Sequence, residues 1–111
     1  MNGTILPPSA NLLPYACSKV AIHQITQCLA RALGGSGINV NSIAPGMTAT
    51  EANLIQSNSE ALFEATIAAQ YLKRREEPED LTGTAVFLAT PDSEFITGQL
   101  IIVDGGAAFT T

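Results

Sequence analysis

The chain is poor in basic residues. Its 111 residues include 5 lysines and arginines against 10 aspartates and glutamates, which gives a formal net charge of −5 at pH 7. No basic stripe runs along the sequence, so we expect no nucleic-acid partner. No apolar run approaches the ~20 residues that a membrane-spanning helix needs, and we expect no membrane insertion. The first residues lack a basic region followed by an apolar stretch, so we also expect no secretory signal.

Cysteine and histidine are scarce as well. Cys17 and Cys28 are the two cysteines, and His23 is the one histidine. On one helix the two cysteines would lie about 16 Å apart at ~1.5 Å per residue, beyond the disulfide reach of roughly 7 Å between Cα atoms. Two reduced thiols that pack in a core fit the cytosol, so we expect a cytoplasmic protein. These spacings predict no metal site.

What the chain does contain suits a packed core. Hydrophobic residues make up 46% of the sequence and charged residues 14%. This balance excludes a disordered chain. A length of 111 residues allows one small domain or part of a larger one.

A long helix is predicted from Leu13 to Leu33. Apolar residues recur there at spacings of three and four, which is the period of an amphipathic helix. Pro14 suits the first turn, and Gly34-Gly35 would stop the helix. The recurring apolar residues are Ile22, Ile25, Leu29 and Leu33.

The remaining pattern predicts an α/β fold. The glycines after the first helix open a strand, whereas a phosphate-binding loop follows a strand and opens a helix, so we reject that function for them. A helix, a turn and a strand are half of a crossover unit, which favours a parallel sheet. The predicted elements after the turn are a strand at 38–44 ended by Pro45-Gly46, helical pieces at 51–71 broken around 57–59, a helix from about 78 to 89, and a strand at 100–103.

Tyr15 and Lys19 form a candidate acid–base pair. Four positions on a helix place both side chains on one face, one turn apart. A free tyrosine loses its proton near pH ~10, and a cation within about 4–6 Å favours the phenolate. Such a phenol can give a proton to a forming alkoxide or take one from an alcohol. The alternative is an ordinary tyrosine beside a solvated lysine at the start of a helix.

Two later segments bear on a site. Ligands of parallel sheets bind beyond the carboxyl ends of the strands. Met47 to Thr50 follows the first strand, so we expect its two hydroxyls and its free backbone amides to touch a ligand. The charged cluster from Lys73 to Asp80 is expected to be a solvated turn.

Four motifs, taken in order, resemble the C-terminal part of a short-chain dehydrogenase/reductase. Tyr15-Ala-Cys-Ser-Lys19 is similar to the family's Tyr-x-x-x-Lys. Asn41 to Gly46 is similar to its strand and Pro-Gly turn, and Thr50 to the threonine that follows. Gly98 to Gly106 is similar to the closing strand. The resemblance covers nearly the whole chain, which we interpret as one partial Rossmann-like domain over residues 1–111, part of a doubly wound parallel sheet with flanking helices.

The resemblance implies an NAD- or NADP-dependent oxidoreductase that interconverts an alcohol and a carbonyl compound. Tyr15 would be the general acid/base, and Lys19 would favour the phenolate and hold the ribose hydroxyls of the nicotinamide. The backbone around Pro45, Gly46 and Thr48, together with Thr50, would hold the nicotinamide end. The family's Tyr–Lys helix and the helix that follows it form a subunit interface, so a homo-oligomer or association with a full-length relative is expected.

The sequence also departs from the family pattern. The family's glycine-rich cofactor loop and its catalytic asparagine have no counterpart in these residues. The position of the family's catalytic serine falls at Met1 to Thr4, where no serine stands; Thr4 is a possible substitute, whereas Ser9 lies too close to Tyr15 in the sequence for this role. Glu76 stands where the family often has glycine. A non-catalytic interaction module is therefore the alternative function.

Overall fold

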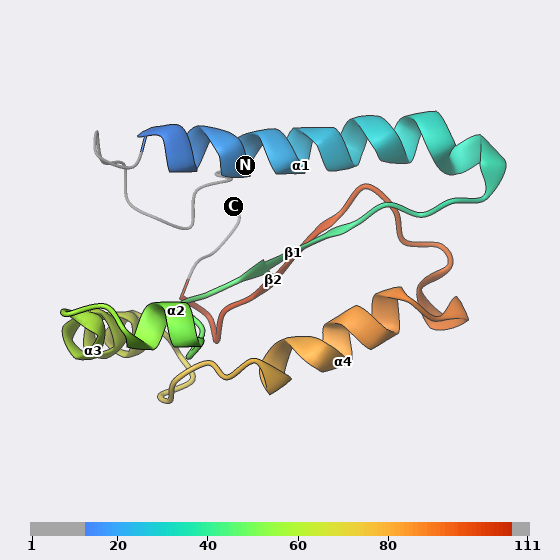
Figure 1. Cartoon of the computed structure of the whole chain (residues 1–111). Coiled ribbons are helices and arrows are strands. Elements are labelled where there is room, and N and C mark those ends of the chain that lie inside the picture. Colours follow the sequence, from blue (N-terminus) through green and yellow to red (C-terminus); the bar gives the residue numbers. More distant parts are fainter. Residues whose placement is uncertain (1–12, 108–111) are drawn as a thin grey trace.

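The computed structural model describes residues 13–107 of the chain (Figure 1). Its first element, α1 (Leu13–Leu33), has the predicted bounds. The helix passes into a 3-10 turn, η2 (Gly34–Ser36), and the chain then reverses at Gly37. Gly37 has a φ of 76°, and its amide donates a hydrogen bond of 3.0 Å to the Gly34 carbonyl. The left-handed conformation that ends the helix thus belongs to the third glycine of the turn.

Two parallel strands form the sheet of the described region. β1 (Ser42–Pro45) pairs with β2 (Leu100–Val103), with Ser42 opposite Leu100 and Pro45 opposite Val103. The prediction of a parallel sheet is confirmed, and β2 has its predicted bounds.

β1 begins later than the predicted strand at 38–44. The side chains of Asn39 and Asn41 hold the preceding segment to the loop before β2. The Asn41 amide nitrogen donates to the Ile96 carbonyl over 2.9 Å, and its oxygen accepts from the Gln99 amide over 3.0 Å. The Gly98 amide also donates to the Val40 carbonyl over 2.7 Å, but the regular main-chain pairing of the two strands starts at Ser42.

Helices cover both faces of the sheet. Figure 1 shows α1 on one side of the strands and α4 (Glu79–Leu88) on the other. The hydroxyls of Thr26 and Ser42 share a hydrogen bond that ties α1 to β1. Between β1 and α4 the chain forms α2 (Glu51–Leu54) and α3 (Ser59–Ala69), separated by the predicted break. The 3-10 turn η3 (Pro91–Ser93) then leads to β2, which completes the predicted α/β architecture.

The apolar surface is largely uncovered in the described region. Ala30 and Phe63 are the buried apolar residues there. The radius of gyration is 15.3 Å, against about 13 Å for a compact domain of this length. None of the described helices is long and apolar enough to cross a membrane. Exposed apolar side chains are frequent on α1: Tyr15, Ile22, Ile25 and Leu29 lie on one side of the helix, and Leu13 and Val20 lie on the other.

The predicted burial of the two cysteines is wrong. Cys17 and Cys28 are free thiols, and both are exposed. They lie on surfaces of α1 against which residues 13–107 place no other layer. The small cysteine side chains would allow another element to pack closely against α1. The spacing of residues on the helix could not show whether that element belongs to this chain.

We predict that Cys17 and Cys28 form no disulfide with each other. Both lie on one uninterrupted helix, about 16 Å apart along its axis. Intact-mass analysis of the chain labelled with a thiol reagent, without reductant, should show two labelled sites. A loss of two hydrogens within the monomer, with no label, would contradict this prediction.

Candidate active site

Tyr15 and Lys19 lie together in the first turns of α1. The Lys19 ammonium nitrogen sits over the Tyr15 ring, 5.2 Å from its centroid. Contact between a cation and the face of an aromatic ring is attractive, so it favours the side-by-side arrangement that the spacing predicts. The Tyr15 side chain is 50% exposed, which leaves its hydroxyl open to a ligand.

The direction of α1 brings this pair to the carboxyl end of the strands. α1 runs antiparallel to β1, and its start lies at the end of the sheet where β1 finishes (Figure 1). The hydrogen bond between the hydroxyls of Thr26 and Ser42 fixes the middle of the helix at the beginning of β1. Lys19 is then about 10 Å further along the helix axis, which matches the roughly 10 Å from Ser42 to Pro45 along the strand. Lys19 and the Pro45 turn therefore both lie toward the carboxyl end of β1.

The turn after β1 is held mainly by its own chain. Pro45 is the exposed last residue of β1. The Gly46 amide donates to the Val103 carbonyl over 3.1 Å and to Glu76 Oε2 over 2.9 Å. Thr48 is buried, and its hydroxyl donates to the Gly46 carbonyl over 3.3 Å. Thr50 caps α2, because its hydroxyl accepts from the Asn53 amide over 3.3 Å.

The expectation that this turn offers free amides is correct only in part. The amides of Ala49 and Thr50 donate to the carbonyls of Glu76 and Thr48, over 2.7 and 2.8 Å. Within the described part of the chain, the amides of Met47 and Thr48 have no such acceptor. Two adjacent donors at the carboxyl end of β1 are a suitable match for one carbonyl group of a ligand.

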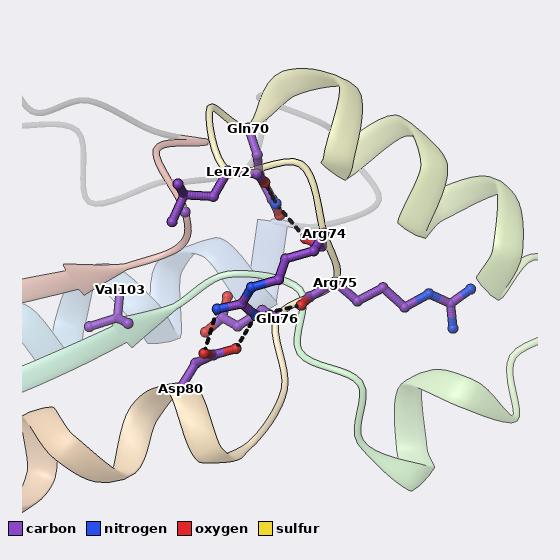
Figure 2. Close-up of a pocket in the computed structure, with 8 residues that line it drawn as sticks. Gln70, Leu72, Arg74, Arg75, Glu76, Asp80 and Val103 are labelled. Atoms are coloured by element: carbon purple, nitrogen blue, oxygen red, sulfur yellow. Dashed lines mark hydrogen bonds and ion pairs between the residues drawn. The ribbon is translucent and has the colours of Figure 1, made fainter.

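The charged segment after α3 differs from the solvated turn that we predicted. Glu76 is buried, with 6% of its surface exposed, and so is Gln70. The Gln70 amide nitrogen donates to the carbonyls of Leu72 and Arg74, over 2.7 and 2.8 Å. These bonds fold the loop inward beneath the end of β2 and carry Glu76 under the turn after β1. A cavity of about 130 Å³ lies beside this loop, and Figure 2 shows side chains that line it.

One ion pair closes this loop on the outside. The Arg74 guanidinium binds both carboxylate oxygens of Asp80, each over 2.7 Å (Figure 2). This bidentate contact, together with a bond from the Glu77 amide, lowers the pKa of Asp80 to about 2 and raises the pKa of Arg74. The pair is solvent-exposed, so its role is to fix the start of α4 rather than to supply charge to a site.

Glu76 itself carries an unusual environment. Burial is the main cause of its raised pKa, and the carboxylates of Asp104 and Asp80 raise the pKa further. The Gly46 amide and the Thr48 hydroxyl lower it. Sequence reasoning missed this residue as a part of the site. One sign of its role was available in the sequence, because Glu76 stands where the family often has glycine. A charged side chain that is buried at such a position needs a hydrogen-bonding partner.

Comparisons with known proteins place these motifs in a family. A family model described as enoyl-(acyl carrier protein) reductase matches residues 2–108. The galactitol 2-dehydrogenase (L-tagatose-forming) of Cereibacter sphaeroides is 39% identical over 106 residues, which are 96% of this chain and 42% of that enzyme. The chain therefore spans about two fifths of the length of this relative.

Solved structures agree with the sequence comparison. A 4-hydroxyisoleucine dehydrogenase complexed with NADH and succinate is similar with a TM-score of 0.74 and 32% identity, over 85% of this chain and 37% of that one. A blue fluorescent protein from a metagenomic library, in complex with NADPH, is similar with a TM-score of 0.75 and 38% identity, over 86% of this chain and 37% of that one. Both resemble this chain in its α/β layers and carry a nicotinamide cofactor. The chain belongs to the short-chain dehydrogenase/reductase family.

Proposed function

We propose that this chain is the catalytic-helix part of an NAD(P)-dependent oxidoreductase that interconverts an alcohol and a carbonyl compound. One arrangement supports the proposal most: Tyr15 and Lys19 are in contact in the first turns of α1, and the start of this helix lies at the end of the sheet where β1 finishes (Figure 1). The relative from Cereibacter sphaeroides is a dehydrogenase of a polyol, which supports a small hydroxylated substrate. The pair is suited to proton transfer. An oxidoreductase of this family needs proton transfer beside the nicotinamide, at the carboxyl end of the strands.

Tyr15 would exchange a proton with the substrate oxygen. In the direction of reduction its hydroxyl gives the proton to the carbonyl oxygen, and in oxidation its phenolate takes the proton of the alcohol. The bound nicotinamide would supply or accept the hydride at the substrate carbon. Lys19, placed over the ring, has donors for the ribose hydroxyls of the cofactor.

The turn after β1 fits the nicotinamide end of such a cofactor. The amides of Met47 and Thr48 can donate to a carboxamide oxygen. The Thr50 hydroxyl is partly engaged by the Asn53 amide but keeps its own proton as a donor. With Pro45 and Gly46 setting the backbone path, these residues form the cofactor-contacting side of the site. Residues 1–111 then constitute one part of a Rossmann-like domain.

An interaction module is the second candidate function. The observation that favours it is the exposed apolar face of α1, with Ile22, Ile25 and Leu29 each more than 40% exposed. Such a face suits a second copy or a full-length relative, and burial of it would stabilise a homo-oligomer. The two exposed free thiols support a reducing cytoplasm as the location. An upstream reading frame that encodes a glycine-rich strand–turn–helix would favour the enzyme over the module.

Replacement of Tyr15 by phenylalanine tests the catalytic role. In the complete enzyme that contains this chain, Tyr15→Phe should lower turnover by roughly 10²–10⁴-fold, because the proton relay is lost while the ring remains. Steady-state kinetics at saturating cofactor and substrate would measure this. Tyr71→Phe is the matched control, since Tyr71 is exposed on the loop after α3, and it should retain most of the turnover. Unchanged turnover in Tyr15→Phe would refute the assignment.

We further predict that the 111-residue chain alone neither binds nicotinamide cofactor tightly nor turns over substrate. Its described sheet has two strands, and sheets of independent stability generally need three or more. The family's glycine-rich loop, which would cradle the pyrophosphate, is not among its residues.

Calorimetric titration with NADH and NADPH and sizing by light scattering would check this on the purified chain. We expect no heat of binding at micromolar cofactor, together with self-association or a loosely folded state. A well-folded monomer with micromolar cofactor affinity would overturn the prediction.

A further inference from the structure

Glu76 holds both ends of the turn after β1 from one position. Its carboxylate Oε2 accepts from the Gly46 amide over 2.9 Å, and its main-chain carbonyl accepts from the Ala49 amide over 2.7 Å. Between them Thr48 forms an isolated parallel bridge with Glu76. The two residues enclosed by these bonds, Met47 and Thr48, are those whose amides face a ligand in the proposed function.

The fit between Glu76 and the turn is close. A Cβ at Gly46 would lie 2.6 Å from Glu76 Oε2 and 3.0 Å from the Asp104 Cβ. A glycine is therefore needed at position 46, because the end of β1, the loop that carries Glu76 and the turn at Asp104 come together there. The side chain of Glu76 is as much a part of this packing as the backbone is.

This arrangement is costly for a carboxyl group. Glu76 is 6% exposed, and its Oε1 has no hydrogen-bond partner among residues 13–107. Asp104, which is also buried, adds a like charge nearby. A buried carboxylate with one unsatisfied oxygen lowers stability. A glycine at position 76 would avoid this cost but could not reach Gly46. The hydrogen bond that the buried carboxylate makes goes to the Gly46 amide, which points to a positional role.

We propose that Glu76 is a positioning residue that sets the backbone of the Gly46–Ala49 turn and so tunes the affinity for the nicotinamide end of the cofactor. The inference rests on the proposed function, in which this turn contacts the cofactor. Glu76 touches neither the substrate nor the reacting atoms. It acts through the two amides that it holds, so its loss should change cofactor binding more than the chemical step.

A comparison of Glu76→Ala with Glu77→Ala in the complete enzyme tests the proposal. Glu77 is the exposed neighbour in the same loop, so its variant controls for changes in loop flexibility. We expect Glu76→Ala to raise the KM and Kd for cofactor about tenfold, which corresponds to the loss of one hydrogen bond to a carboxylate. The kcat at saturating cofactor and the KM for substrate should stay within about twofold in both variants.

Amide exchange supplies a readout that does not depend on activity. Deuterium uptake of a peptide spanning residues 42–50 should rise in Glu76→Ala and not in Glu77→Ala. Faster exchange with unchanged cofactor affinity would show a purely structural contact and overturn the proposal, as would equal effects of the two variants. If Tyr15→Phe keeps full turnover the proposed function fails, whereas an unaltered cofactor affinity in Glu76→Ala, with Tyr15→Phe inactive, refutes this inference alone.

The ionisation of Glu76 gives a pH-dependent signature. Its pKa is raised above the ordinary value of 4.5, by burial first and then by Asp104 and Asp80, while Arg74 pairs with Asp80 on the outer side. The folded state therefore holds the proton more tightly than the unfolded state. This contribution to stability is complete below about pH 4.5 and is lost as the pH rises through the raised pKa.

The neutral variant Glu76→Gln should remove that dependence. Its melting temperature should match the wild type near pH 4 and exceed it increasingly above pH 5, as long as the amide still accepts from Gly46. Thermal unfolding of both proteins across pH 4 to 8 measures the difference between their melting temperatures. The titration of other groups affects both proteins alike and cancels in this difference. Parallel curves for the two proteins would show that Glu76 is not a strained buried acid and would contradict the premise of the proposal.

Discussion

The amide of Gly46 is the point at which three parts of the chain are joined. It donates to the Val103 carbonyl, which extends the parallel pairing one residue past β1, and to the Glu76 carboxylate in the loop before α4. A side chain at position 46 would collide with both Glu76 and Asp104. The direction in which the chain leaves the sheet depends on this contact. The positions of the Met47 and Thr48 amides, which have no main-chain acceptor among the described residues, depend on it as well.

The position of Tyr15 and Lys19, the proposed catalytic pair, depends on a second contact, that of α1 with the sheet. The hydrogen bond between Thr26 and Ser42 sets the height of the helix, and the buried Ala30 allows close approach. Tyr15 and Lys19 then reach the carboxyl end of β1 because the helix is long and straight. Most of the remaining apolar surface of α1 is exposed. A partner that buried this surface would hold the proposed catalytic pair more firmly in place.

Much of the architecture could be predicted from the sequence, for reasons that are local. α1 has a regular apolar period and ends in glycines, and β2 is an apolar run closed by Asp104 and two glycines in left-handed conformations. The start of β1 could not be predicted, because Asn39 and Asn41 bond to residues more than fifty positions away. The burial of Glu76 was missed for the same reason, since its partner Gly46 is thirty positions distant.

The central claim is that the turn after β1 and the Tyr15–Lys19 pair form opposite sides of one nicotinamide site. The most direct measurement is a crystal structure of the complete protein grown with oxidised cofactor. The account predicts the carboxamide oxygen within hydrogen-bond distance of the Met47 or Thr48 amide, and the Lys19 ammonium on the ribose hydroxyls, with Tyr15 facing the reactive carbon. A nicotinamide ring bound away from this turn, or Lys19 directed to solvent in the complex, would contradict it.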